Sequence, residues 1–173
     1  VREGGRLVAL GGACSLGVED WGLNRYSDEE DKETRSDERN AHAKADRYAP
    51  YALSDRNGIR NDIPGAVYAV ALDPTHPLAY GYGDTYWSIK TSSRRFAHMT
   101  KGHNVGVLHG DVKPLSGFAG SRANERLSES LSFGVHDMGA GHVVYLADNV
   151  LFRAFWKDGH KFFANAVFFS AAM

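Results

Sequence analysis

The spacing of hydrophobic and polar residues predicts several short strands along this chain. Short apolar runs rich in β-branched and aromatic residues are bounded by glycine, proline or aspartate, which is typical of sheet strands. A strand closed by glycines and followed by a polar-capped segment also predicts a short helix at 15–23. The expected strands lie at 6–10, 66–72, 85–90 and 104–108.

The second half of the chain predicts helices and a hairpin. The segment 121–131 places charged residues on one side and Ala123, Leu127 and Leu131 on another, as in an amphipathic helix. Two apolar runs at 132–135 and 142–147 flank a glycine-rich turn, which favours an antiparallel hairpin. Two apolar segments near the C-terminus, 151–156 and 162–169, are expected to be helical.

The segment 25–60 has a different composition from the rest of the chain. It is rich in charged residues and alanine and contains almost no large aliphatic side chains, so it cannot fill a core. We therefore expect one domain over 1–173, interrupted by a charged helical or mobile insertion at about 25–60.

The order of these elements predicts the fold class. Strands separated by helices, followed by a hairpin and terminal helices, favour a three-layer α/β domain with a mixed sheet. An all-β sandwich fits this order less well.

Composition narrows the classes of function. The 173 residues suit a single domain, and a formal charge of −1 lacks the basic excess of a nucleic-acid-binding protein. No apolar run reaches the length of about 18 residues that a membrane span requires. The segment 1–5 lacks an initiator methionine and is similar to the glycine-capped end of a helix, so we expect a piece of a longer polypeptide.

The eight histidines do not have metal-ligand spacing. No His-x-x-Glu, His-x-x-x-His or His-Glu-x-x-His pattern occurs, so no metal site is expected in this chain. His109 and Asp111 lie close together on an expected loop, where they have either a metal-binding or acid/base role or belong to an ordinary turn.

Cys14 is the best-placed candidate nucleophile. It follows an expected strand and two glycines and precedes an expected helix, where backbone amides would lower the pKa of a thiol. A nucleophile elbow, however, needs glycine two residues after the nucleophile, and this chain has Leu16 there and Gly17 one position late. The competing interpretation is a small buried thiol.

Two further binding patterns were weighed. The segment 11–17 is rich in glycine but matches neither the dinucleotide-binding fingerprint nor the P-loop, so nucleotide binding is not favoured. Scattered aromatic residues either belong to the core or line a groove for a sugar or another small molecule. The residues of this alternative are Tyr80, Tyr82, Tyr86, Trp87 and Trp156.

Several motifs, in the same order along nearly the whole chain, resemble a known family. Together they are similar to the C-terminal region of bacterial, Bacteroidetes-type zinc carboxypeptidase-family proteins, in particular the long secreted forms with several domains. The charged stretch 25–60 departs from the family pattern. The motifs lie at 4–11, 64–68, 72–81, 104–106, 116–120 and 148–156.

The resemblance implies a fold for this chain and places catalysis in a separate domain. In such proteins a separate peptidase domain binds zinc through a His-x-x-Glu pair and a distant histidine, and none of those elements occurs in these residues. The region resembled is a class I glutamine amidotransferase-like domain of flavodoxin-like, three-layer build, with a mainly parallel sheet, a C-terminal hairpin and a lost nucleophile elbow. Zinc is therefore expected only in the peptidase domain, and no cofactor in this chain.

The resemblance also implies a function and a location. The leading hypothesis is a non-catalytic accessory or interaction domain of a secreted, periplasmic or extracellular zinc carboxypeptidase. Its expected partner is the upstream peptidase domain of the same polypeptide, with a homodimer left open. The alternatives are a degenerate amidotransferase or hydrolase that uses Cys14, with His109 and Asp111 as further candidates, and a module that binds a small molecule or sugar.

Overall fold

A computed structural model describes residues 1–18, 21–24, 26, 58–169 and 172–173 of the chain. The insertion expected at about 25–60 therefore lies almost entirely outside the described residues.

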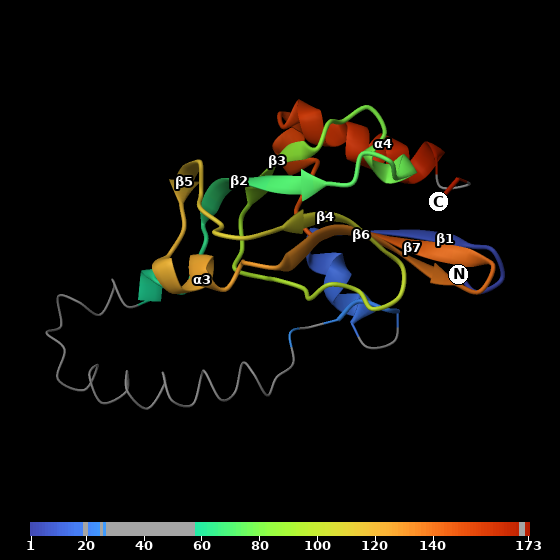
Figure 1. Ribbon diagram of the computed structural model, residues 1–173, viewed down its shortest axis with the longest axis horizontal. Coiled ribbons are helices and arrows are strands. Elements are labelled where there is room, and N and C mark those ends of the chain that lie inside the picture. The colour runs from blue at the N-terminus through green and yellow to red at the C-terminus, as the bar shows by residue number, and fades with distance from the viewer. Residues whose placement is uncertain (19–20, 25, 27–57, 170–171) are drawn as a thin grey trace, which may run out of the picture.

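The described residues form one seven-stranded mixed sheet (Figure 1). Its strand order is β1-β7-β6-β4-β2-β3, and the short strand β5 pairs with β2 beside this path. Only β1 and β7 are parallel, and all the other pairs of this sheet are antiparallel. The strands are β1 (Arg6–Leu10), β2 (Gly65–Leu72), β3 (Thr85–Lys90), β4 (His103–Leu108), β5 (Ser116–Phe118), β6 (Ser130–Met138) and β7 (Gly141–Leu146).

The helices of the described residues are short. The α-helices are α3 (Ser121–Glu125) and α4 (His160–Phe168), and residues 58–59 are α-helical as well. The other helical segments are 3-10 turns: η1 (Gly11–Gly17), η3 (Pro77–Ala79), η4 (Phe152–Ala154) and η5 (Lys157–Gly159).

The expected fold class is wrong. The sheet is curled into a half-barrel with few helices, whereas a three-layer flavodoxin-like domain has a mainly parallel sheet between two helical layers. Parallel neighbours need long crossover connections, usually helical. Among the described strands, β2 to β7 are joined by turns and loops with one short helix, and every pair formed among these six strands is antiparallel.

The two helices expected before β2 and β6 form only in part. Of the described residues in 15–23, residues 15–17 belong to the 3-10 segment η1, and Val18 and Leu23 form an isolated bridge. A Cβ on Gly17 would lie 2.3 Å from the Tyr145 hydroxyl, so the chain can approach β7 this closely only with glycine. At 121–131, α3 ends at Glu125, because Leu131 already belongs to β6 and pairs with Val107.

Other predicted elements are confirmed. The strands at 6–10, 66–72, 85–90 and 104–108 are present within one residue at either end, and the hairpin around 138–141 joins β6 to β7. Of the two C-terminal helices, α4 is confirmed, while 151–156 forms only the 3-10 turn η4.

Both faces of the sheet carry apolar clusters. Because side chains alternate along a strand, Val144 and Leu146 of β7 belong to the cluster beneath α4, and Val143 and Tyr145 to the cluster beside η1. Helix α4 thus covers one face and η1 lies against the other.

Helix α4 is anchored by Phe162. The Phe162 ring stacks on Phe133 with centroids 4.3 Å apart and on Tyr82 with centroids 4.4 Å apart. Full burial of such a side chain stabilises the fold by about 1.5–3 kcal/mol. Asn165, also buried, donates hydrogen bonds from its side chain to the carbonyls of Leu78 and Tyr80, which ties α4 to η3.

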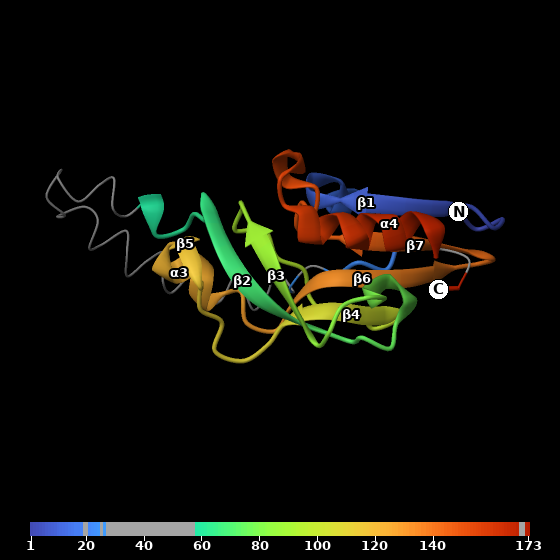
Figure 2. The same cartoon turned by 90° about the horizontal axis from the view of Figure 1, so that it is seen from above.

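The curl of the sheet brings its far strand close to the parallel pair (Figure 2). Strands β2 and β4 share only the pairs Ala71 with Val107 and Leu72 with Gly106, so β2 and β3 swing away from the plane of β6. Asp148, just after β7, then accepts hydrogen bonds from Ser88 Oγ at 2.8 Å and Lys90 Nζ at 2.9 Å, both on β3. The side chains of Lys90 and Asp148 are 3% and 5% exposed.

We expect Asp148→Ala to lower the free energy of unfolding by about 3–5 kcal/mol, because it leaves the Lys90 ammonium buried without its partner. Urea denaturation measures the loss. Asp111→Ala is the matched control, because the ion pair of Asp111 with Lys113 is exposed to solvent and its removal should change stability little. Equal losses of stability in the two variants would contradict the conclusion that Asp148 holds β3 close to the end of β7.

Candidate functional site

Cys14 is buried in the structure, and its surroundings disfavour the reactive thiolate form. Its side chain is 0% exposed within the apolar cluster beside η1, and its Sγ donates to the Ala9 carbonyl at 3.4 Å. Burial raises the pKa of the thiol to about 12, so the nucleophilic thiolate is absent at neutral pH. This arrangement matches the interpretation of Cys14 as a small buried thiol.

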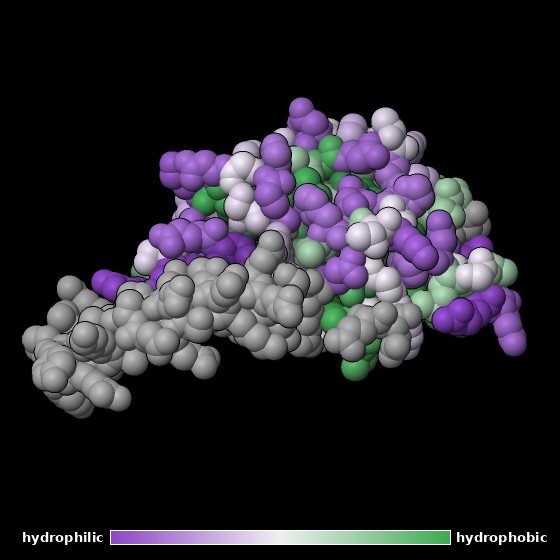
Figure 3. Space-filling view, turned by 60° about the horizontal axis from the view of Figure 1, so that its bottom comes forward, coloured by the Kyte–Doolittle hydropathy of each residue, from purple (hydrophilic) through white to green (hydrophobic). Residues whose placement is uncertain are grey.

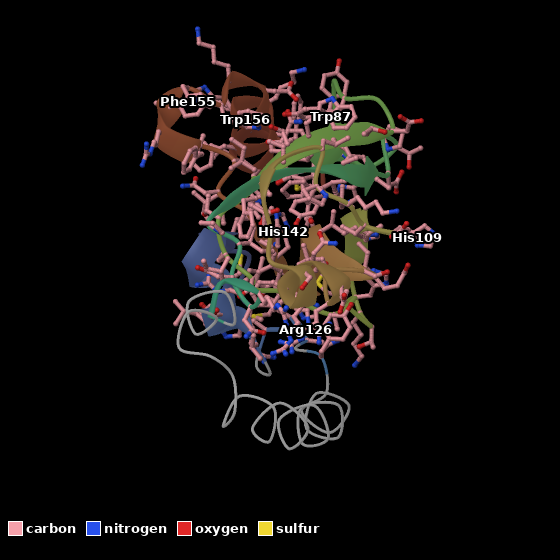
Figure 4. The ribbon with its side chains drawn as sticks, turned by 90° about the vertical axis from the view of Figure 1, so that its left-hand side faces the viewer. Trp87, His109, Arg126, His142, Phe155 and Trp156 are labelled. Carbon is pink, nitrogen blue, oxygen red and sulfur yellow. The ribbon has the colours of Figure 1, made fainter. Side chains whose placement is uncertain are left out.

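His109 and Asp111 have separate partners. His109 Nδ1 lies 2.7 Å from Glu129 Oε1, and Asp111 pairs with Lys113. Both pairs are exposed at the end of β4, and Figure 4 shows His109 at the periphery of the molecule. The pKa of the Glu129 carboxyl is lowered, first by a hydrogen bond from the Gly110 amide and then by His109. These contacts hold a surface turn together.

The structure therefore does not join the three sequence-derived candidates into one site. Cys14 contacts a backbone carbonyl in the core, whereas His109 and Asp111 form ion pairs at the surface. A base within hydrogen-bond reach of the nucleophile is the basic requirement of nucleophilic catalysis. Within the described part of the chain, the Cys14 thiol donates its hydrogen bond to the Ala9 carbonyl and not to a histidine or another base.

Three other histidines gather where β4 and β7 begin. The rings of His76 and His103 lie 5.2 Å apart, and His142 is buried on β7 with Asp137 opposite it on β6. Burial is the main cause that lowers the pKa of both His76 and His142. Across the described part of the chain, no three histidine, cysteine or acidic side chains are arranged to hold a metal ion.

The aromatic residues separate into a core set and a groove set. Tyr82 and Tyr86 pack with Phe162 in the core, and Tyr80 lies against Phe169 at the surface. Trp87 and Trp156 instead line a surface groove of about 490 Å³. The Trp156 Nε1 donates to the Trp87 carbonyl at 3.1 Å, and Figure 4 shows both residues at the same end of the molecule.

Around this groove the outward face of β2 and β3 is apolar. Trp87 lies opposite Ala69, and Ile89 lies opposite Val67, all on the face that points away from α4. A sheet face in contact with solvent normally carries polar side chains. At these outward-facing positions of β2 and β3 the side chains are apolar instead. Trp87 is 48% exposed. Sequence reasoning classed 66–72 as a strand but missed this face, although the alanines at 69 and 71 signal it.

The groove has a mixed rim. Val67 and Leu115 form its apolar side, and Lys157 and Asp158 lie at the other side beside Trp156. The Leu115 amide donates to the Val67 carbonyl at 2.8 Å, which fixes this exposed leucine next to β2. Phe118, on the adjoining strand β5, is also exposed. An apolar floor with a few charges at the rim is a surface suited to binding.

Comparisons of this chain with protein-family models, with curated proteins and with solved structures found no match. None of the helices in the described part of the chain has the length and apolar character needed to cross a bilayer.

We expect iodoacetamide to label Cys14 in the folded protein far more slowly than a free thiol at pH 8, because the thiol is buried and its pKa is raised. Mass spectrometry over time measures the rate, and the same chain in urea is the control for intrinsic reactivity. Labelling of the folded chain as fast as in urea would restore the hydrolase alternative.

We expect the free energy of unfolding to fall as the pH drops below about 6.5, the ordinary pKa of histidine. The pKa of His76 is lowered in the folded state, mainly by burial. The neutral imidazole therefore contributes to stability above the ordinary histidine pKa, and this stability is lost as the pH falls. Protonation also blocks His76 Nδ1, which accepts from the Leu78 amide at 3.1 Å.

His76→Asn keeps an acceptor for that amide without a titrating group and should reduce the acid sensitivity, as measured by urea denaturation from pH 7 to 5. The exposed His160 is the control, and His160→Asn should leave the pH profile unchanged. Unaltered acid sensitivity in His76→Asn would remove His76 from this explanation.

Proposed function

We propose that this chain is a non-catalytic interaction domain of a secreted zinc carboxypeptidase-like protein. The observation that carries the proposal is the apolar outward face of β2 and β3, with the groove between Trp87 and Trp156 beside it. A contiguous exposed apolar surface rimmed by charges is typical of a protein-binding site.

The geometry of the groove favours a polypeptide partner. Indole rings bury much apolar area while keeping one polar group, which is why tryptophan is enriched at interfaces. Here the Trp156 Nε1 is already satisfied by the Trp87 carbonyl, so its ring is fixed in place before any partner arrives. Fixed side chains lose less conformational entropy on binding.

The state of Cys14 supports a non-catalytic role over the hydrolase alternative. A nucleophile needs access to substrate and a base that activates it. Cys14 is enclosed in the core, and burial raises the pKa of its thiol. The function proposed for this domain is therefore binding.

The parent protein is proposed from the sequence motifs at 64–68, 72–81 and 148–156. Their resemblance to zinc carboxypeptidase-family proteins supports a peptidase domain in the same polypeptide as the partner, and a periplasmic or extracellular location. The zinc ion and the peptide hydrolysis belong, in this proposal, to that peptidase domain.

A second candidate function is the binding of a small molecule or a sugar. The volume of the groove, about 490 Å³, lies in the range of small-molecule sites, and two indole rings line it. Of the five aromatic residues that the sequence suggested, only Trp87 and Trp156 line this groove.

The test is co-expression of the chain with the polypeptide encoded directly upstream in the same reading frame, followed by co-purification. The proposal expects a His-x-x-Glu peptidase domain there, and a complex that Trp87→Lys weakens by about tenfold or more, because a charge would be placed on the apolar face. Calorimetric titration measures the affinity.

Phe168→Lys is the matched control, because Phe168 is an aromatic residue 80% exposed on α4, outside the groove. Equal weakening by both variants, or no complex at all, would contradict the proposal. Saturable binding of an oligosaccharide that Trp87→Lys abolishes would favour the second candidate. Self-association lost in Trp87→Lys would show instead that the groove is a homodimer contact.

A further inference from the structure

We infer that a second, polar cleft at the carboxyl ends of β1 and β7 binds a small oxyanion, a carboxylate or a phosphate, through the guanidinium of Arg94. This inference is independent of the proposed function, because the cleft and the Trp87–Trp156 groove have no lining residue in common.

The cleft lies where three segments distant in sequence converge. Its volume is about 350 Å³, and it is lined by Gly11, Gly12, Thr91, Ser92, Arg94 and Asn149, among others. Strands β1 and β7 end level with each other, because Leu10 pairs with Leu146. Here the curl of the sheet adds the segment that follows β3.

The groups that face the cleft include several hydrogen-bond donors. Among the described residues the Arg94 guanidinium has no ion pair, and it is exposed. Asn149 uses its Oδ1 to accept from the Leu151 amide at 3.1 Å, so its Nδ2 remains as a donor. Thr91 and Ser92 contribute hydroxyls. A guanidinium with neighbouring amide and hydroxyl donors matches the oxygens of a carboxylate or phosphate.

The Asp148 carboxylate, which lines the cleft, repels an anion only weakly. Both Asp148 oxygens are occupied, one by Lys90 at 2.9 Å and the other by Ser88 at 2.8 Å. The buried Lys90–Asp148 pair is neutral as a unit. The remaining charge among the lining residues is therefore the single positive charge of Arg94.

The two glycines keep the cleft open beneath Arg94. A Cβ on Gly12 would lie 3.6 Å from Arg94 Nη1, so the guanidinium is positioned directly over this residue. Gly11 has a φ of +53°, and nothing lies within 4 Å of the place where its Cβ would be. An anion beside Arg94 can thus approach the backbone closely, as larger residues would not allow.

The size of the cleft restricts the ligand. About 350 Å³ is near the lower limit for small-molecule sites, so a metabolite-sized acid or a phosphate monoester fits and a nucleic acid does not. On the face drawn in Figure 3, hydrophilic residues predominate over the coloured part of the surface. The cleft differs from a flat hydrophilic surface by its concave shape and by the positive charge of Arg94.

The test is calorimetric or NMR titration of the whole chain with inorganic phosphate and, separately, with glutamate, at constant ionic strength maintained with chloride. Saturable binding of either oxyanion is expected, and the two arms show which one the cleft prefers. Arg94→Ala should weaken this binding by about tenfold or more, because it removes the charge-assisted hydrogen bonds. Gly12→Ala should weaken it while leaving the charge unchanged, because the added methyl group enters the space beneath Arg94.

Arg2→Ala is the matched control. Arg2 is an exposed arginine whose backbone carbonyl accepts from Ala140, beside the turn where β7 begins, so it lies at the opposite end of that strand from the cleft. Its loss changes the net charge as Arg94→Ala does and should leave binding unchanged. Equal weakening of anion binding by both arginine variants would overturn the inference. Binding that chloride abolishes at the same concentration as the oxyanion would also overturn it. No saturable binding of either anion would do the same.

Discussion

The buried contact of Asp148 with Ser88 and Lys90 is the constraint on which the shape of this domain depends. Asp148 follows β7, and its two partners lie on β3, the strand at the other end of the sheet order. A flat sheet would keep these groups apart, and a charged pair in the core is costly unless both members are satisfied. The contact is therefore compatible only with a curled sheet. The groove and the polar cleft both lie beside the segments that it joins.

The two candidate binding surfaces are chemically complementary to different ligands. The groove beside Trp87 is apolar with charges at its rim, whereas the cleft beside Arg94 is polar with one uncompensated positive charge. Both include residues of, or directly after, β3 together with residues that follow β7. Ligands at the two sites would thus contact β3 or the residues that directly follow it.

The sequence predicted the candidate functional residues only in part. Leu16 in place of glycine argued against an elbow at Cys14, and the burial of this thiol agrees. Trp87 and Trp156 were named as groove residues, but Tyr82 and Tyr86 pack in the core, where the Tyr82 ring stacks on Phe162 and the Tyr86 ring meets it edge-on. Arg94 was not singled out, since an isolated arginine in a loop carries no pattern. Its role depends on Gly12, which is far from it in sequence.

The sequence by itself determined the local elements, because strand alternation and turn residues act between near neighbours. It therefore located β1, β2, β3, the β6–β7 hairpin and α4. It did not determine which strands pair. The mainly parallel sheet that we expected required long helical crossovers, whereas the described residues of 15–23 and of 121–131 contain only part of the 3-10 segment η1 and the short helix α3. Pairing, the curl and the meeting of Asp148 with β3 depend on contacts between distant residues, which only the tertiary structure decides.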